Sequence, residues 1–205
     1  QAPWVCYLAY TAPHLPFEAP PSHLHTQNLA GKSPSRDARD FYKSMIEAMD
    51  SEIGRLLATL GPTVMANTHV LFAGDNGSVQ RMAIAPFNGN KAKGSPYEGG
   101  LNVPLIVGGP AVTVPGREEA ALTTTVDLFA TVLEMVGAQS ALPEWVATDS
   151  VSLLPYLAST TQQPLRAYVY SEEFTGNVWP APNQNGHAVV RDARVQPAVP
   201  QSLPY

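Results

Sequence analysis

The sequence has very little cysteine and little charge. Cys6 is the only cysteine among 205 residues, which excludes an internal disulfide. Charged residues make up 14% and hydrophobic residues 44%, and this composition excludes a disordered chain, which would be poor in apolar residues and rich in charge. The 12 basic residues are scattered and are outnumbered by 17 acidic ones, for a formal charge of −5. We therefore expect no nucleic-acid partner.

Long hydrophobic runs are also missing. Stretches such as 103–107 are far shorter than the ~20 apolar residues of a membrane helix, so we expect no membrane span. No secretory leader pattern precedes the first apolar run, and Gln1 lies inside an expected strand, as a cut end would. Proline is abundant, with 20 residues against 15 glycines, which predicts ordered, proline-rich loops.

Hydrophobic spacing predicts strands that alternate with helices. Short apolar runs indicate buried strands, and apolar residues at steps of three and four indicate helices. The expected strands are 4–10, 68–73 and 103–107, and the expected helices are 37–60, ending at Gly61-Pro62, and 126–136, ending at Gly137. Beyond 138 we expect a short helix at 152–157 and strands at 167–171 and 187–191 in a smaller antiparallel unit. The alternation predicts an α/β domain with its ligand site at the carboxyl ends of the strands.

Asp75 and Asn76 follow directly after the expected strand 68–73. A carboxylate and an amide carbonyl side by side are oxygen ligands of the kind that Ca²⁺ and Mg²⁺ take. The same letters, Gly74-Asp-Asn-Gly77, are also a common turn sequence with no ligand. Spacing alone does not decide between a metal site and a turn.

Two lysines, Lys91 and Lys93, precede a glycine-rich stretch that begins at Gly94. A lysine held by close backbone packing can act as a point charge for a tetrahedral oxyanion. The alternative is a solvated basic loop, since most lysines are exposed.

His14 lies between Pro13 and Pro16, just beyond the expected first strand. A histidine there could bind an anion or protonate a leaving oxygen near neutral pH, or it could only cap a turn. Taken in order, His14, the pair Asp75 and Asn76, and Lys93 place three kinds of phosphate- or sulfate-handling group at one edge of a sheet. The order of these groups carries more information than any one motif.

These passages together resemble the type I sulfatases of the alkaline phosphatase superfamily. The resemblance runs from about Pro3 to Arg191 and rests on YTAPHLPF, EAMDSEIGRLL, VLFAGDNGS, KGSPYEGGLNVPLIVGGP, TTTVDLFATVLEMVGA and, more loosely, SLLPYL and HAVVRDAR. It implies an alkaline phosphatase-like mixed sheet flanked by helices, with the start of a smaller antiparallel carboxyl-terminal unit. We expect 1–160 to be the second half of a sulfatase catalytic domain and 161–205 to begin the small subdomain.

The resemblance also implies a chemistry, the cleavage of sulfate esters with Ca²⁺, or alternatively Mg²⁺, and a formylglycine nucleophile. Carried over residue by residue, Asp75 and Asn76 match metal ligands, and Lys93 matches the lysine that binds the sulfate. His14 matches the histidine at the sulfate and the leaving-group oxygen. Lys91, the other lysine of this segment, does not match the family's sulfate-binding lysine.

The family's nucleophile motif, C/S-x-P-x-R, is missing from this sequence. Cys6 is followed by Tyr-Leu-Ala-Tyr, and its flanks instead predict a buried strand residue; in 32–36 the residue two before Pro34 is Lys32, which offers no thiol or hydroxyl. We therefore expect an N-terminal segment or a second chain to complete the active site.

Two other functions stay open at this stage. A phosphate or phosphonate ester hydrolase of the same superfamily would handle an oxyanion of the same geometry, and a chain without its nucleophile could be a non-catalytic binding module. The loops 79–90 and 175–186, with Trp179, are expected to set the substrate. The family resemblance implies a periplasmic or secreted location, or a lysosomal-type compartment in a eukaryote.

Overall fold

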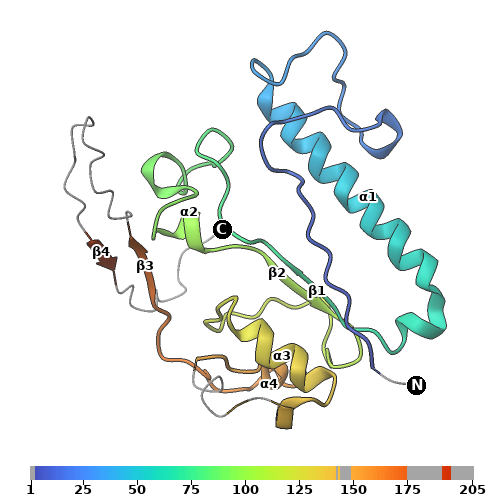
Figure 1. The fold of residues 1–205 in the computed structure, drawn as a ribbon, viewed down its shortest axis with the longest axis vertical. Helices are drawn as coiled ribbons and strands as arrows, with labels where there is room; N and C mark the ends of the chain where they lie inside the picture. Colours follow the sequence, from blue (N-terminus) through green and yellow to red (C-terminus); the bar gives the residue numbers. More distant parts are fainter. Residues whose placement is uncertain (1–2, 142, 144–148, 175–190, 195–205) are drawn as a thin grey trace, which may run out of the picture. The chain divides into compact units, whose positions relative to one another are not determined.

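The chain divides into two units in a computed structural model that describes residues 3–141, 143, 149–174 and 191–194 (Figure 1). The first unit is Gln1–His69 and the second is Val70–Tyr205. Within the described residues, no helix combines the length and the apolar character that crossing a membrane requires.

The first unit is built around the long helix α1 (Ala38–Met65), preceded by a loop with one short 3₁₀ turn, η1 (Ser22–Leu24). One face of α1 is buried, through residues at steps of three and four: Ala38, Phe41, Ser44 and Ala48. The helix bends at Gly61, whose positive φ of 73° breaks the helical backbone, and Pro62 begins the last turn. The predicted helix is therefore confirmed, but its predicted end at Gly61-Pro62 is a kink, after which the helix continues to Met65.

The loop before α1 is fastened to the helix by apolar and polar contacts. Phe17 is buried and packs edge to face against Tyr42, with ring centroids 5.6 Å apart. Farther along, the Glu47 carboxylate accepts hydrogen bonds of 2.5 Å from both the backbone N–H of Thr26 and Nε2 of Gln27. These contacts fix a proline-rich segment that has few backbone hydrogen bonds of its own.

The predicted first strand is wrong for the chain as it stands. Residues 4–10 are extended, but no strand among the described residues pairs with them. Tyr7 is 88% exposed and Trp4 is 52% exposed, and Cys6, expected to be buried, is exposed as well. The apolar pattern is typical of a buried strand, but burial needs a neighbour that pairs with it or covers it.

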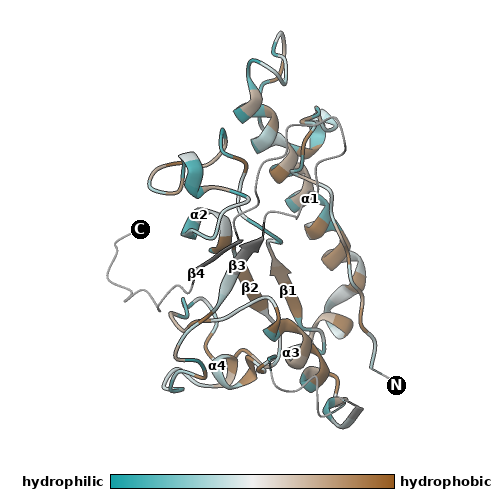
Figure 2. Cartoon of the chain, turned by 60° about the vertical axis from the view of Figure 1, so that its left-hand side comes forward, coloured by the Kyte–Doolittle hydropathy of each residue, from teal (hydrophilic) through white to brown (hydrophobic). Residues whose placement is uncertain are grey.

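The second unit contains a two-stranded sheet of β1 (Val70–Ala73) and β2 (Leu105–Gly108). Both strands are apolar along their length, as Figure 2 shows. They pair antiparallel, with Val70 opposite Gly108 and Ala73 opposite Leu105. The prediction that a ligand site would form where carboxyl ends meet is corrected here, because the carboxyl end of β1 meets the amino end of β2. Residues after β1 and residues before β2 still share one edge.

Two short elements lie in the loop between the strands: a 3₁₀ turn, η2 (Gly89–Lys91), and a single helical turn, α2 (Glu98–Leu101). Beyond β2 come α3 (Asp127–Met135), which ends before Gly137 with φ 70°, a 3₁₀ turn η3 (Gln139–Ala141) and α4 (Leu154–Ala158). Both predicted helices of this region are confirmed.

The helices α3 and α4 are tied together by buried polar groups. Asp127 is fully buried, and its carboxylate accepts the backbone N–H of Val151 at 2.9 Å and Nε of Arg166 at 3.1 Å. That hydrogen bond is the main cause of the raised pKa of Arg166. The buried hydroxyl of Thr131 accepts the backbone N–H of Leu153 at 2.9 Å. Pairing of this kind is what allows a carboxylate to lie inside a protein.

The chain ends, in its described part, with an antiparallel pair of β3 (Ser171–Phe174) and β4 (Arg191–Arg194). The antiparallel unit predicted for this region is confirmed, with each strand three or four residues later than expected. Residues 187–190 of the predicted last strand, the loop 175–186 and Trp179 lie outside the described residues. The division into 1–160 and 161–205 stays a prediction.

Candidate active site

The turn that carries Asp75 and Asn76 is held on both sides by the backbone of the segment that leads into β2. The N–H of Gly74 donates to the carbonyl of Pro104 at 2.9 Å, and the N–H of Gly77 donates to the carbonyl of Gly100 at 3.0 Å. Asp75 is exposed and Asn76 is half-buried. The two oxygen-bearing side chains therefore project from a turn whose ends are fixed.

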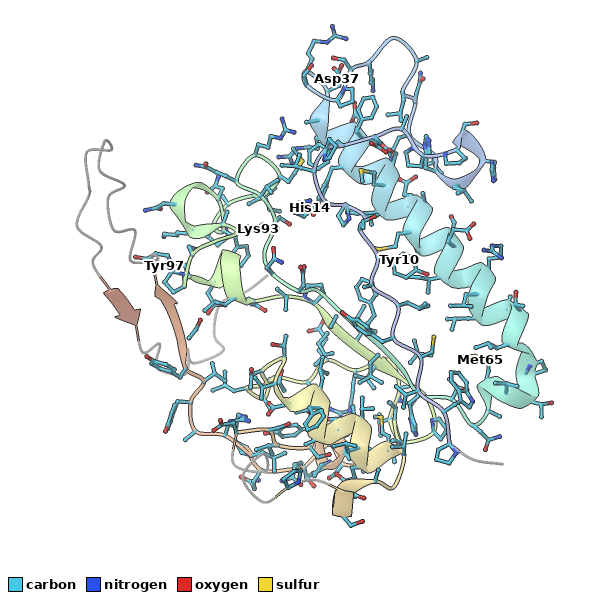
Figure 3. All side chains as sticks on the ribbon, viewed as in Figure 1. Tyr10, His14, Asp37, Met65, Lys93 and Tyr97 are labelled. Atoms are coloured by element: carbon cyan, nitrogen blue, oxygen red, sulfur yellow. The ribbon has the colours of Figure 1, made fainter. Side chains whose placement is uncertain are left out.

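Lys93 is attached to the same network through its backbone. Its N–H donates to the carbonyl of Ser78 at 3.0 Å, while its side chain is exposed. The residue before it, Ala92, is only 2% exposed, and the residue after it, Gly94, has φ 80°. Figure 3 shows Lys93 in the loop that also carries Tyr97 and leads to α2. The structure thus brings the Asp75-Asn76 turn and the Lys93 loop together, as their order along the chain predicted.

Glycine is required where these two segments meet. A Cβ atom on Gly77 would lie 1.8 Å from the carbonyl oxygen of Gly99, and a Cβ on Gly100 would lie 2.1 Å from that of Ser95. A Cβ on Gly99 would lie 2.4 Å from the carbonyl oxygen of Phe87. Such distances leave no room for any side chain, so the glycines of GDNG and YEGG permit direct contact between backbones.

His14 lies in the first unit, where the extended segment turns toward α1 (Figure 3). Its ring Nδ1 is 2.8 Å from the carbonyl oxygen of Leu15. A carbonyl can only accept, so Nδ1 carries the hydrogen of this bond and Nε2 is left for another partner. Its backbone N–H donates to the carbonyl of Thr11 at 2.8 Å. Proximity of His14 to the three site residues of the second unit stays a prediction.

The donors for a metal ion form an incomplete set in the part of the chain that the structure describes. Among the described residues, no group of three or more His, Cys, Asp or Glu side chains gathers to hold a metal. The carboxylate of Asp75 and the amide oxygen of Asn76 are hard donors that suit Ca²⁺ or Mg²⁺, but Ca²⁺ takes about six to eight oxygens. The pair fits a divalent cation as part of a ligand shell, with the other ligands coming from elsewhere.

A cavity of about 360 Å³ opens beside this turn. The loop 79–90 was expected from the sequence to set the substrate, but the cavity itself was not predicted. Asn76, Gly77 and Ser78 form one wall. The rest is lined by the loop 82–87 and by the segment 98–104, which includes the carboxyl-bearing Glu98. The available signal was weak: a few apolar residues in a loop without helical or strand periodicity.

Comparison with known proteins gives a consistent result. The family model described as Sulfatase matches residues 1–138. Steryl-sulfatase of Rattus norvegicus is 31% identical over 160 residues, covering 72% of this chain and 27% of that protein. The uncharacterized sulfatase YdeN of Escherichia coli (strain K12) is 33% identical over 164 residues, covering 78% of this chain and 28% of that protein.

The structure is similar to a solved one as well. The crystal structure of Ps i-CgsB aligns with a TM-score of 0.60 and 28% identity, covering 74% of this chain and 32% of that chain. The chain therefore spans less than a third of the length of these relatives.

Proposed function

The chain belongs to the sulfatase family, and from this premise we propose that it forms part of a hydrolase that cleaves sulfate esters. The observation that carries the proposal is the hydrogen-bonded junction of the Asp75-Asn76 turn with the Lys93 loop at one edge of the β1–β2 sheet. It joins metal-type oxygen donors to a lysine on a fixed backbone. A sulfate ester is a tetrahedral anion, and these are the groups that would neutralise it.

We assign to Asp75 and Asn76 the binding of a divalent cation, Ca²⁺ or alternatively Mg²⁺. When bound, the cation would withdraw charge from the sulfate oxygens and make the sulfur easier to attack. The support is the chemistry of the two donors and the fixed ends of their turn.

Lys93 is proposed to hold the sulfate with a positive charge where the transition state carries negative charge. Its backbone bond to Ser78 and its buried neighbour Ala92 limit the movement of the loop, so little reorganisation is needed during the reaction. A donor of this kind is often worth ~3 kcal/mol of transition-state stabilisation.

His14 is proposed to protonate the departing oxygen. In the protonated ring, Nδ1–H stays on the Leu15 carbonyl and the proton on Nε2 is given to the alcohol or phenol oxygen as the sulfur–oxygen bond breaks. The hydrogen bond to Leu15 fixes the ring so that only Nε2 takes part in the transfer.

The nucleophile is proposed to be a formylglycine on a segment outside these residues, because the sequence contains no C/S-x-P-x-R motif. Cys6, the only thiol, is not followed by that motif. That segment is the partner we propose for this chain, together with the sulfate ester itself. A periplasmic or secreted location, or a lysosomal-type compartment in a eukaryote, is part of the same proposal, and cell fractionation would test it.

Comparative turnover tests the proposal directly. The natural protein, with any segment that accompanies these residues, should hydrolyse para-nitrophenyl sulfate faster than para-nitrophenyl phosphate. Chelation should remove the activity, and Ca²⁺ should restore it. Faster phosphate cleavage would instead identify a phosphate or phosphonate ester hydrolase. The intact mass of the purified protein, measured in parallel, would show whether a nucleophile-bearing segment accompanies the chain.

A further inference from the structure

We propose that the cavity beside Asn76 binds the neutral, apolar part of the sulfate ester and so contributes to substrate choice. This inference rests on the proposed function, since it places the ester's alcohol or phenol group next to the residues assigned to its sulfate. The cavity volume of about 360 Å³ is at the small end of the range for small-molecule sites.

The loop that lines the cavity is folded by its own backbone. The N–H of Met82 donates to the carbonyl of Val79 at 2.8 Å, and the N–H of Phe87 donates to that of Ile84 at 2.8 Å. These two turns keep Met82 buried at 9% exposure and leave Ile84 62% exposed at the cavity. The cavity is therefore lined by an ordered loop.

The far wall is equally constrained. The backbone of Phe87 packs directly against Gly99, because a Cβ on that glycine would lie 2.4 Å from the Phe87 carbonyl oxygen. On the other side, the backbone N–H of Gly77 donates a hydrogen bond to the carbonyl of Gly100. The loop 82–87 and the segment 98–104 are therefore both held by the backbone contacts that also fix the turn of Asp75 and Asn76.

The lining favours an apolar group without a second negative charge. Met82, Ile84, Phe87 and Val103 present hydrocarbon or thioether surface, and removing such surface from water favours the binding of an apolar group. Asn76, Ser78, Glu98 and Asn102 also line the cavity, and they are the side chains there that could pair with the hydroxyls of a sugar ring, whereas hydroxyls placed against the apolar residues would stay unpaired. A second sulfate would meet the carboxylate of Glu98, which also lines the cavity.

Asn76 connects the cavity to the proposed reaction. It lines the cavity and also belongs to the turn assigned to the cation. A ligand with its apolar group in the cavity would therefore have its charged end beside Asn76. A cavity at another edge of the sheet would not share a residue with the turn assigned to the cation.

Naphthol, which has no sulfate, tests the cavity separately from catalysis. Titration of the natural protein, with any segment that accompanies these residues, should give saturable binding of naphthol by NMR, and Ile84→Ser should weaken it roughly tenfold. Ile106→Ser is the matched control, because Ile106 is 63% exposed but lies on β2 outside the cavity lining. Ala83→Phe, which would fill the cavity with a ring, should abolish binding without removing apolar surface.

Three results would overturn the inference: no saturable naphthol binding, equal affinity in the wild type and Ile84→Ser, or tighter binding of a monosaccharide sulfate than of naphthyl sulfate. The proposed function is judged separately by turnover in the natural protein. Naphthol binding that depends on Ile84, without any sulfate ester hydrolysis, would support the cavity and reject the function. Naphthyl sulfate hydrolysis that Ile84→Ser leaves unchanged would support the function and reject the cavity.

Discussion

The backbone N–H of Lys93 donates to the carbonyl oxygen of Ser78 at 3.0 Å. This one bond joins the loop with the lysine proposed to bind sulfate to the residue that follows the turn of Asp75 and Asn76. Because the bond uses only backbone atoms, it fixes the start of the Lys93 side chain without using its ammonium group. The point from which the side chain starts is therefore set by the fold, and the ammonium group is left for a ligand.

Replacing Lys93 by methionine should lower turnover of para-nitrophenyl sulfate by the natural protein about 100-fold, corresponding to ~3 kcal/mol of transition-state stabilisation. Methionine keeps a long side chain and the backbone bond while removing the charge. Lys91→Met is the matched control, since Lys91 is also an exposed lysine in the same loop, and its turnover should be unchanged. Equal losses in the two variants would mean that only the general charge of the loop matters.

Gly77→Ala should destabilise the second unit by roughly 3 kcal/mol, because the added methyl group would overlap the carbonyl oxygen of Gly99. Gly54→Ala is the matched control. No atom lies within 4 Å of the position of its Cβ, and Gly54 is inside α1, so alanine should stabilise the protein by ~0.5–1 kcal/mol. Thermal unfolding followed by circular dichroism measures both. A stable Gly77→Ala protein would show that the turn and α2 can separate without loss.

The local parts of the fold could be predicted, and the pairings could not. The helix α1 follows from apolar residues at steps of three and four and from Gly61-Pro62, all of which are neighbours in sequence. The run 4–10 has the pattern of a buried strand, yet it is exposed, since pairing depends on partners that a local pattern does not contain. The antiparallel register of β1 and β2 is unpredictable for the same reason.

The site was predicted to a similar degree. The resemblance to sulfatases, based on the order of its motifs, is confirmed by the family match. Asp75, Asn76 and Lys93 were expected at one edge, and the structure joins their segments there. Ser78 was missed as part of the site, because a backbone acceptor leaves no distinctive residue pattern. The loop 79–90 was expected to set the substrate, but the cavity that its residues 82–87 line could not be predicted from an irregular apolar loop.

Asp127→Asn should lower the free energy of unfolding by about 3 kcal/mol, because it leaves Arg166, only 20% exposed, without its carboxylate. Loss of the negative charge also weakens the hydrogen bond from the backbone of Val151. Glu52→Gln is the control, since it removes the half-buried partner of the exposed Arg55 on α1, and such surface pairs contribute little. Urea unfolding of the two variants provides the comparison, and a loss in Asp127→Asn no larger than in the control would contradict the structural role of the buried pair.

Glu47→Gln should reduce stability near neutral pH and have progressively less effect as the solution is acidified. The hydrogen bonds from the backbone of Thr26 and the side chain of Gln27 lower the pKa of Glu47 from its ordinary value of 4.5. A carboxyl group whose pKa is lower in the folded than in the unfolded protein stabilises the fold above the unfolded value, and that stabilisation is lost as pH falls through the folded value. Unfolding midpoints of the wild type and variant, measured from neutral to strongly acidic pH, should therefore converge on the acid side. Glu18→Gln, at an exposed carboxylate of the same unit, controls for the general loss of negative charge and should follow the wild type throughout. A constant difference between Glu47→Gln and wild type at every pH would mean that the carboxylate charge does not anchor the loop.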